Sequence, residues 1–155
     1  MEGIVAHAAQ QCLLNIARFL SNATAAGTAN EGLPVLEEGA QFHAAWLETQ
    51  PMGGAMYATR SAHIALNNIL IFMRTQRTDG ALPGQTGTNT KGNSLTGDFG
   101  SIQGLFFAAP AVDMALFIRL APGADPSVLD AYLAELAQVL EGYDGWLHSR
   151  YDDAR

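Results

Sequence analysis

The spacing of hydrophobic residues along the chain predicts four helices of two kinds. Over residues 4–20 the apolar positions recur about four apart, which is typical of an amphipathic helix with one face on a core. Over 61–76 they cover nearly every side, so this helix should be buried on most sides. Residues 104–121 predict a second buried helix. Residues 127–147 return to a single apolar face and predict an amphipathic helix.

The segments between these helices are long and rich in glycine. Residues 21–59 contain a pattern for one short helix at 41–48 and otherwise indicate loop, and residues 78–103 have no hydrophobic period. Loops of that length in a compact domain are often functional. No alternation long enough for a pair of strands is present. We therefore expect one all-α domain over residues 1–155, in which buried inner helices alternate with amphipathic outer helices.

The composition of the chain indicates which kinds of partner it can bind and which it cannot. Hydrophobic residues make up 48% of the chain, and charged residues make up 15%, against about 25% in an average soluble domain. Part of the surface should therefore face an apolar neighbour, either a second copy of the chain or complementary helices C-terminal to it. The 15 acidic residues outnumber the 8 basic ones. A nucleic-acid backbone needs the opposite balance, so no nucleic-acid partner is expected.

Metal, cofactor and membrane sites are not expected either. One cysteine, Cys12, and 4 scattered histidines do not supply the ligands of a structural zinc site. The most apolar stretch, 104–121, contains Pro110, Asp113 and Arg119, which make a membrane-spanning helix costly. The N-terminal residues lack the positive charge of a secretory signal, so we expect a cytoplasmic protein.

Two stretches combine the residue types that bind sugars. Residues 46–84 and 98–116 each place a loop of aromatic, amide and charged residues directly at the end of a buried helix. Aromatic faces stack on the apolar face of a sugar ring, and planar amide, guanidinium and carboxylate groups bond to its hydroxyls. Gly53, Gly54 and Gly104 would let a ring approach the backbone closely. The glycine-rich segment 84–94 lacks the residue order of a phosphate loop.

The same stretches resemble the six-hairpin glycosidases. The loop TQPMGGAMYATR, the helix IALNNILIFMRTQR and the later IQG-FF motif are similar to that superfamily, and the likeness covers residues 42–155. It implies part of an (α/α)6 toroid of twelve helices and a glycoside hydrolase that processes carbohydrate. It also implies a substrate site at the mouth of the toroid, to which we add Asp98 from the loop before the second buried helix. The predicted substrate-binding residues are Trp46, Gln50, Met52, Tyr57, Arg60, Asp79, Asp98 and Gln103.

Asp79 is the least secure member of this set. A helix over 61–76 would be about 24 Å long, so Asp79 and Arg60 would stand at its opposite ends unless the 78–103 loop folds back. Asp79 is equally explained as a turn residue.

No catalytic residue is assigned. Glycoside hydrolysis needs two carboxyl groups facing each other across the bond, and in the superfamily the acid and the base usually lie further along the chain than residue 155. The four or five helices predicted here account for about a third of such a twelve-helix ring. The chain would then be a fragment or subunit of a glycoside hydrolase, inactive alone.

One alternative functional class remains open, and a further one is weaker. The open alternative is a non-catalytic helical module that binds sugar or another protein through an exposed inner face. Other α-toroids, the terpenoid and lanthionine cyclases, need aspartate-rich or His and Cys metal motifs, which the sequence does not contain.

Overall fold

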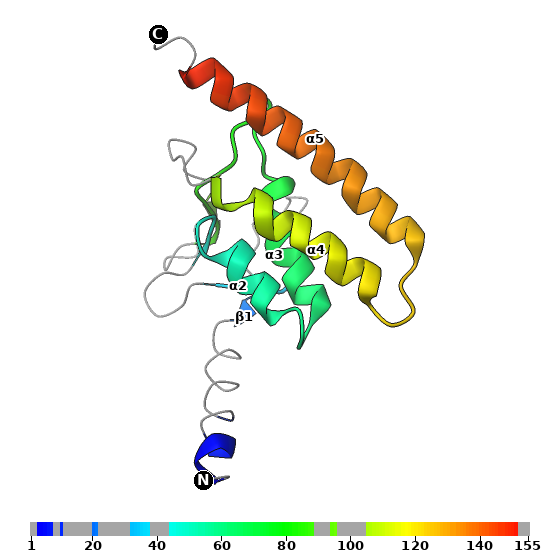
Figure 1. Ribbon diagram of the computed structural model, residues 1–155. Coiled ribbons are helices and arrows are strands. Elements are labelled where there is room, and N and C mark those ends of the chain that lie inside the picture. The colour runs from blue at the N-terminus through cyan, green and yellow to red at the C-terminus, as the bar shows by residue number, and fades with distance from the viewer. Residues whose placement is uncertain are drawn as a thin grey trace.

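The computed structural model describes residues 3–7, 10, 20–21, 32–37, 44–88, 94–95 and 105–151. This part of the chain is mostly helical, as predicted (Figure 1). Its main helices are α2 (Gln50–Tyr57), α3 (Ala62–Met73), α4 (Ala108–Leu120) and α5 (Pro126–Tyr151). Residues 3–7 are also helical, and their side chains are exposed.

Helix α3 forms the centre of the core. Eight of its twelve residues are buried, including Ile69 and Phe72, which confirms the prediction of a helix buried on most sides. Ser61 has an extended backbone at its start and its side-chain oxygen accepts a hydrogen bond from the Ile64 N–H at 3.3 Å, an N-cap that satisfies one of the free amides of the first turn.

Helices α4 and α5 run antiparallel and are joined by a short loop (Figure 1). Asp125 precedes α5 and accepts hydrogen bonds from both the backbone N–H and the hydroxyl of Ser127, and Pro126 occupies the first turn, where its fixed backbone suits a helix start. The buried face of α5 consists of Tyr132, Leu136, Val139, Tyr143 and Trp146. The apolar Leu133 is 43% exposed, whereas the neighbouring Tyr132 is buried and its hydroxyl donates to the Ala111 carbonyl at 2.5 Å.

The turn after α3 packs directly on α5. Gly80 has φ of 93°, and a Cβ at this position would overlap the backbone carbonyl of Gly142. The Gln76 amide donates to the carbonyls of Gly80 and Val139 at 2.9 and 2.8 Å. A glycine is therefore required at position 80 both for its left-handed backbone and for the space that it leaves to α5.

Helix α4 is less buried than its composition indicates. Among its thirteen residues, Pro110, Ala111 and Met114 are buried, whereas Val112, Leu116 and Leu120 are 52, 54 and 77% exposed. The expectation of a second helix buried on most sides is wrong for the chain by itself. The described helices contact one side of α4, and no described residue covers the other side.

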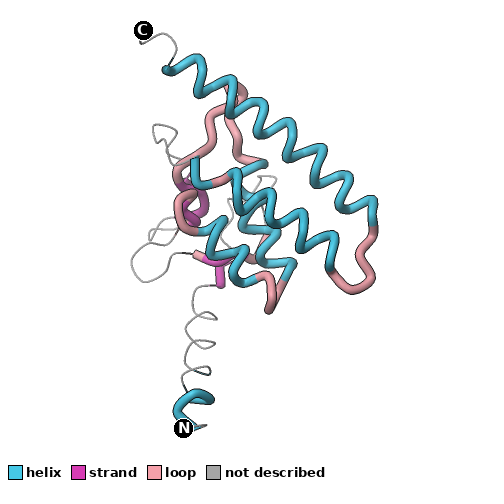
Figure 2. Tube along the Cα trace, in the orientation of Figure 1, coloured by secondary structure: helices cyan, strands magenta, loops and turns pink. Residues whose placement is uncertain are grey.

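Short strands, absent from the prediction, gather at one side of the helices (Figure 2). β1 (Leu20–Ser21) pairs antiparallel with β2 (Val35–Leu36), so Leu20 is extended and does not end the predicted first helix. β4 (Gln85–Thr88) lies between β3 (Ala45–Trp46) and β5 (Ser94–Leu95), antiparallel to both.

The short helix predicted at 41–48 is wrong for residues 44–48. Ala45 pairs with Thr86 and Trp46 with Gln85, and the Leu47 amide donates to the Gly84 carbonyl at 2.9 Å. This pairing with a segment about forty residues away overrides the local helical pattern. The helix begins after this segment, at Gln50.

Candidate functional site

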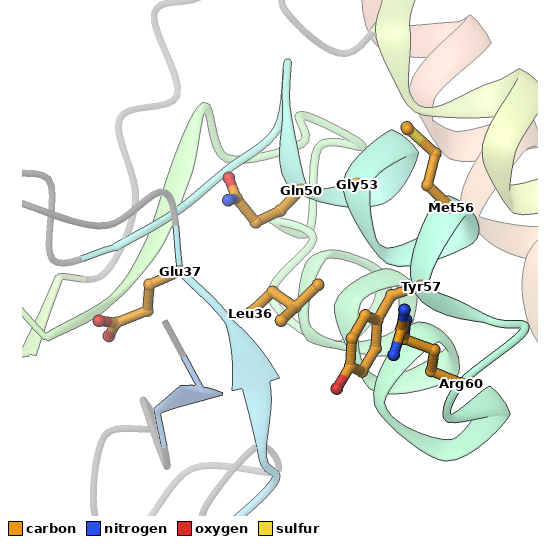
Figure 3. Close-up of a pocket in the computed structure, with 7 residues that line it drawn as sticks. All are labelled: Leu36, Glu37, Gln50, Gly53, Met56, Tyr57 and Arg60. Carbon is orange, nitrogen blue, oxygen red and sulfur yellow. The ribbon is translucent and has the colours of Figure 1, made fainter. Parts of the chain in front are cut away.

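A pocket of about 350 Å³ opens beside the N-terminal half of the chain. Helix α2 supplies one wall, the turn that joins α2 to α3 supplies part of the rim, and the end of strand β2 supplies the opposite side (Figure 3). The residues that line it are Leu36, Glu37, Gln50, Gly53, Met56, Tyr57 and Arg60. Gln50, Gly53 and Tyr57 lie on α2 at a spacing of three and four residues, so they share one face of the helix.

Two buried asparagines of α3 bring strand β2 to this site. The Asn68 side chain accepts from the Leu36 N–H at 2.9 Å and donates to the Leu36 carbonyl at 3.0 Å. The Asn67 amide donates to the Pro34 carbonyl at 2.8 Å. Both asparagines are at most 2% exposed. Together they fix Leu36, and with it the adjacent Glu37, across from α2.

Helix α2 approaches α3 closely enough to form the wall because residue 54 is a glycine. A Cβ on Gly54 would lie 2.7 Å from the Asn68 Cβ, whereas a Cβ on Gly53 would meet nothing within 4 Å. Gly54 therefore permits the close crossing of the two helices. Gly53 leaves the pocket wall open where a ligand could contact the backbone.

Gln50 is the buried polar group of the pocket. Gln50 is 6% exposed as a whole residue. Its side-chain oxygen accepts hydrogen bonds from the Trp46 N–H at 2.9 Å and the Thr49 hydroxyl at 2.6 Å. The Nε2 amine makes no hydrogen bond with any residue of the described part of the chain. In Figure 3 this amide is directed toward the side of the pocket formed by Leu36 and Glu37. The two bonds to the oxygen hold the amide in place and leave its donors for a ligand.

The rest of the pocket combines an apolar surface with two opposite charges. Leu36, Met56 and the Tyr57 ring supply the apolar surface. Glu37 and Arg60 lie on opposite sides, with Leu36 between them (Figure 3). An aromatic ring, a fixed amide and charged groups around an apolar surface are able to bind a small polar ligand that has one apolar face.

The structure brings together three of the eight predicted site residues. Gln50, Tyr57 and Arg60 line the pocket. Trp46, half-buried in β3, is not in the lining, and its backbone N–H donates to the Gln50 side-chain oxygen. Met52 is 53% exposed on α2 and is not part of the lining. Asp98 and Gln103 lie outside the described residues.

Asp79 lies beyond the opposite end of α3, and its carboxylate is paired with Arg77. It accepts two hydrogen bonds from the Arg77 guanidinium, at 2.8 and 2.5 Å, and one from the Ala81 N–H at 3.2 Å. The bonds from Arg77 lower the pKa of Asp79 to about 2. With α3 about 18 Å long at twelve residues, Asp79 does not contribute to this pocket.

The sequence interpretation did not include Leu36, Glu37 and Met56. A signal for the first two does exist, because Asn67 and Asn68 are the only polar residues between Ile64 and Met73. Buried amides require partners, but the sequence does not say that those partners are thirty-two residues upstream.

The chain has no match among known protein families, curated proteins or solved structures. In the described ranges, no group of three or more His, Cys, Asp and Glu side chains is placed to hold a metal ion. None of the described helices combines the length and apolar character needed to cross a membrane.

Proposed function

We propose that this chain is a carbohydrate-binding helical protein related to the six-hairpin glycosidases, and that the pocket between α2 and β2 holds one sugar ring. The observation that carries the proposal is the grouping of Gln50, Tyr57 and Arg60 around a single pocket. These are three of the residues that the resemblance implies at the substrate site.

The chemistry of the pocket supports a sugar over a wholly apolar ligand. The Tyr57 ring and Leu36 offer a surface for the C–H face of a pyranose. The side-chain oxygen of Gln50 accepts hydrogen bonds from Trp46 and Thr49, which fixes the amide and leaves its amine to donate to a ring hydroxyl or ring oxygen.

We propose binding without hydrolysis for the chain alone. Inversion or retention needs two carboxyl groups on either side of the glycosidic bond. Among the lining residues, Glu37 is the single carboxylate. A second one would have to come from outside the described residues or from a partner.

The affinity of pocket variants for sugar tests this proposal. Saturation-transfer NMR with D-glucose and D-glucuronate should show binding to the wild-type chain. Tyr57→Ala should weaken it severalfold, since aromatic stacking contributes about 0.5–1.5 kcal/mol. Met56→Ala, in the lining, should change the affinity, whereas Met52→Ala, one turn earlier on the same helix and outside the lining, should not. The pocket would be rejected if neither sugar bound, or if the two methionine variants had equal effects.

The apolar face of α4 supports a second candidate function, association with another helical partner. Val112, Leu116 and Leu120 are spaced four apart and are all more than half exposed. Such a stripe resembles the packing face of a helix in a bundle. We propose that it contacts either a second copy of the chain or the complementary helices of a toroid.

A further inference from the structure

The cationic side of the pocket consists of one arginine that has no partner in the described structure. Arg60 ends the turn between α2 and α3, where its backbone N–H donates to the Tyr57 carbonyl at 2.9 Å. Its side chain is exposed and forms no ion pair or hydrogen bond with a described residue. It lines the pocket with its guanidinium next to the apolar surface (Figure 3).

Most other described arginines are engaged. Arg77 binds Asp79 through two hydrogen bonds, Arg74 lies 3.7 Å from Glu135, and Arg150 lies over the Trp146 ring at 5.6 Å. In a chain of net charge −7, an arginine that lines a pocket and has no acidic partner is available for an anion of the ligand. Arg119, near the end of α4, is exposed and outside the pocket lining, so it provides a control.

The polar groups of the pocket also set the direction of such a ligand. Glu37 lies on the side opposite Arg60, and the Gln50 amide is directed toward the side of the pocket where Leu36 and Glu37 lie (Figure 3). An anionic group would be attracted to Arg60 and repelled by Glu37. Ring hydroxyls would be suited to Glu37, which accepts, and to Gln50, which donates.

We propose that the pocket binds a sugar acid, a pyranose whose carboxylate is held by Arg60 and whose hydroxyls face Glu37 and Gln50. This rests on the proposed sugar site and specifies its substrate class. The planar guanidinium matches a carboxylate through two parallel hydrogen bonds. A single negative charge balances one guanidinium, whereas a doubly charged phosphate would add an uncompensated charge to a pocket that already contains Glu37.

Calorimetric or NMR titration with three related ligands separates the alternatives. D-glucuronate carries a carboxylate at the position where D-glucose carries a hydroxymethyl group, and glucose 6-phosphate carries a phosphate there. Glucuronate should bind at least about tenfold more tightly than glucose, the loss expected for one charge-assisted bond. This difference should shrink when the ionic strength rises from about 0.05 to about 0.5 M, because Arg60 is exposed to solvent.

Substitutions should show that Arg60 is responsible. Arg60→Gln should remove the preference for glucuronate, so that the affinity for glucuronate falls to that for glucose. Arg60→Lys should keep part of the preference, since it retains the charge but loses the planar fork. Arg119→Gln has the same change in net charge and should have no effect on either ligand.

The outcomes distinguish this inference from the proposed function. Equal binding of glucose and glucuronate, both weakened by Tyr57→Ala and neither by Arg60→Gln, would overturn the sugar-acid assignment and leave the sugar site standing. Tighter binding of glucose 6-phosphate than of glucuronate would also overturn it, in favour of a sugar phosphate. Failure of all three ligands to bind would overturn both.

Discussion

The bidentate contact between Arg77 and Asp79 governs the protonation of that carboxyl group. The two hydrogen bonds from the guanidinium favour the ionised form, so the pKa of Asp79 lies at about 2, below its ordinary value of 3.8. Because the folded-state pKa is lowered, any stabilisation is present above about pH 4 and is lost as the pH falls through 2. Both side chains are about half exposed, so the contribution to stability is small.

We expect the Asp79 carboxyl carbon to titrate at about pH 2 in an NMR experiment. The variant Arg77→Gln should raise that midpoint toward 3.8, because the charged hydrogen-bond donor is lost. A midpoint near 3.8 in the wild-type chain would contradict the contact.

Asn68 is the residue on which the position of Leu36 and Glu37 depends most. Asn68→Ala removes two hydrogen bonds to Leu36 and leaves backbone groups without partners, so it should lower the free energy of unfolding by about 2 kcal/mol. Asn67→Ala removes the one bond to Pro34 and should cost about half as much. Denaturant unfolding measures both. Equal or negligible losses would show that β2 is held by other contacts.

At the scale of the elements, the crossing of α2 and α3 should tolerate no side chain at position 54. Gly54→Ala places a methyl group 2.7 Å from the Asn68 Cβ, so we expect destabilisation by about 1–3 kcal/mol. Gly53→Ala, one residue earlier with nothing within 4 Å, should be neutral or stabilising by up to about 1 kcal/mol, because alanine favours a helix. Thermal unfolding of the two variants checks this; matching melting temperatures would contradict the close crossing.

The sequence predicts well those helices whose buried faces are marked by the pattern of hydrophobic residues within the helix itself. Helix α3 is apolar on most sides, and α5 has one apolar face and a clear start at Asp125 and Pro126. Helix α2 was expected to be loop because it contains Gly53 and Gly54, which disfavour a helix. Pro51 lies in its first turn, where proline is compatible with a helix. Its helical form depends on packing against α3, a tertiary effect that local propensity does not report.

In the candidate site, too, some residues could be predicted from the local sequence and others depend on tertiary contacts. The residues Gln50, Tyr57 and Arg60 are close in sequence, and the pocket brings them together. Leu36 and Glu37 reach the pocket through bonds to Asn68, thirty-two residues away, and these bonds leave no local pattern around residue 36. Asp79, which the length of the helix already made the least secure member of the predicted set, stands at the opposite end of α3 from Arg60.

At the scale of the molecule, the exposed apolar face of α4 should cause association. Val112, Leu116 and Leu120 leave contiguous apolar surface in a chain with few charges. We expect sedimentation at micromolar concentration to show species larger than the monomer. Leu116→Glu should shift them to monomer, whereas Ala137→Glu, at an exposed position of α5, should not. A wild-type chain that is monomeric throughout would contradict a partner surface made for a second copy.

The position of a bound sugar ring is the most direct test of the central claim, that the pocket between α2 and β2 holds carbohydrate. Isotope-filtered NOE spectra of the labelled chain with unlabelled D-glucuronate should show contacts from sugar ring protons to the Tyr57 ring, the Leu36 methyl groups and the Met56 methyl group. Contacts to Tyr143 or Trp146 on α5, without contacts to Tyr57 and Leu36, would place the sugar elsewhere and contradict the account.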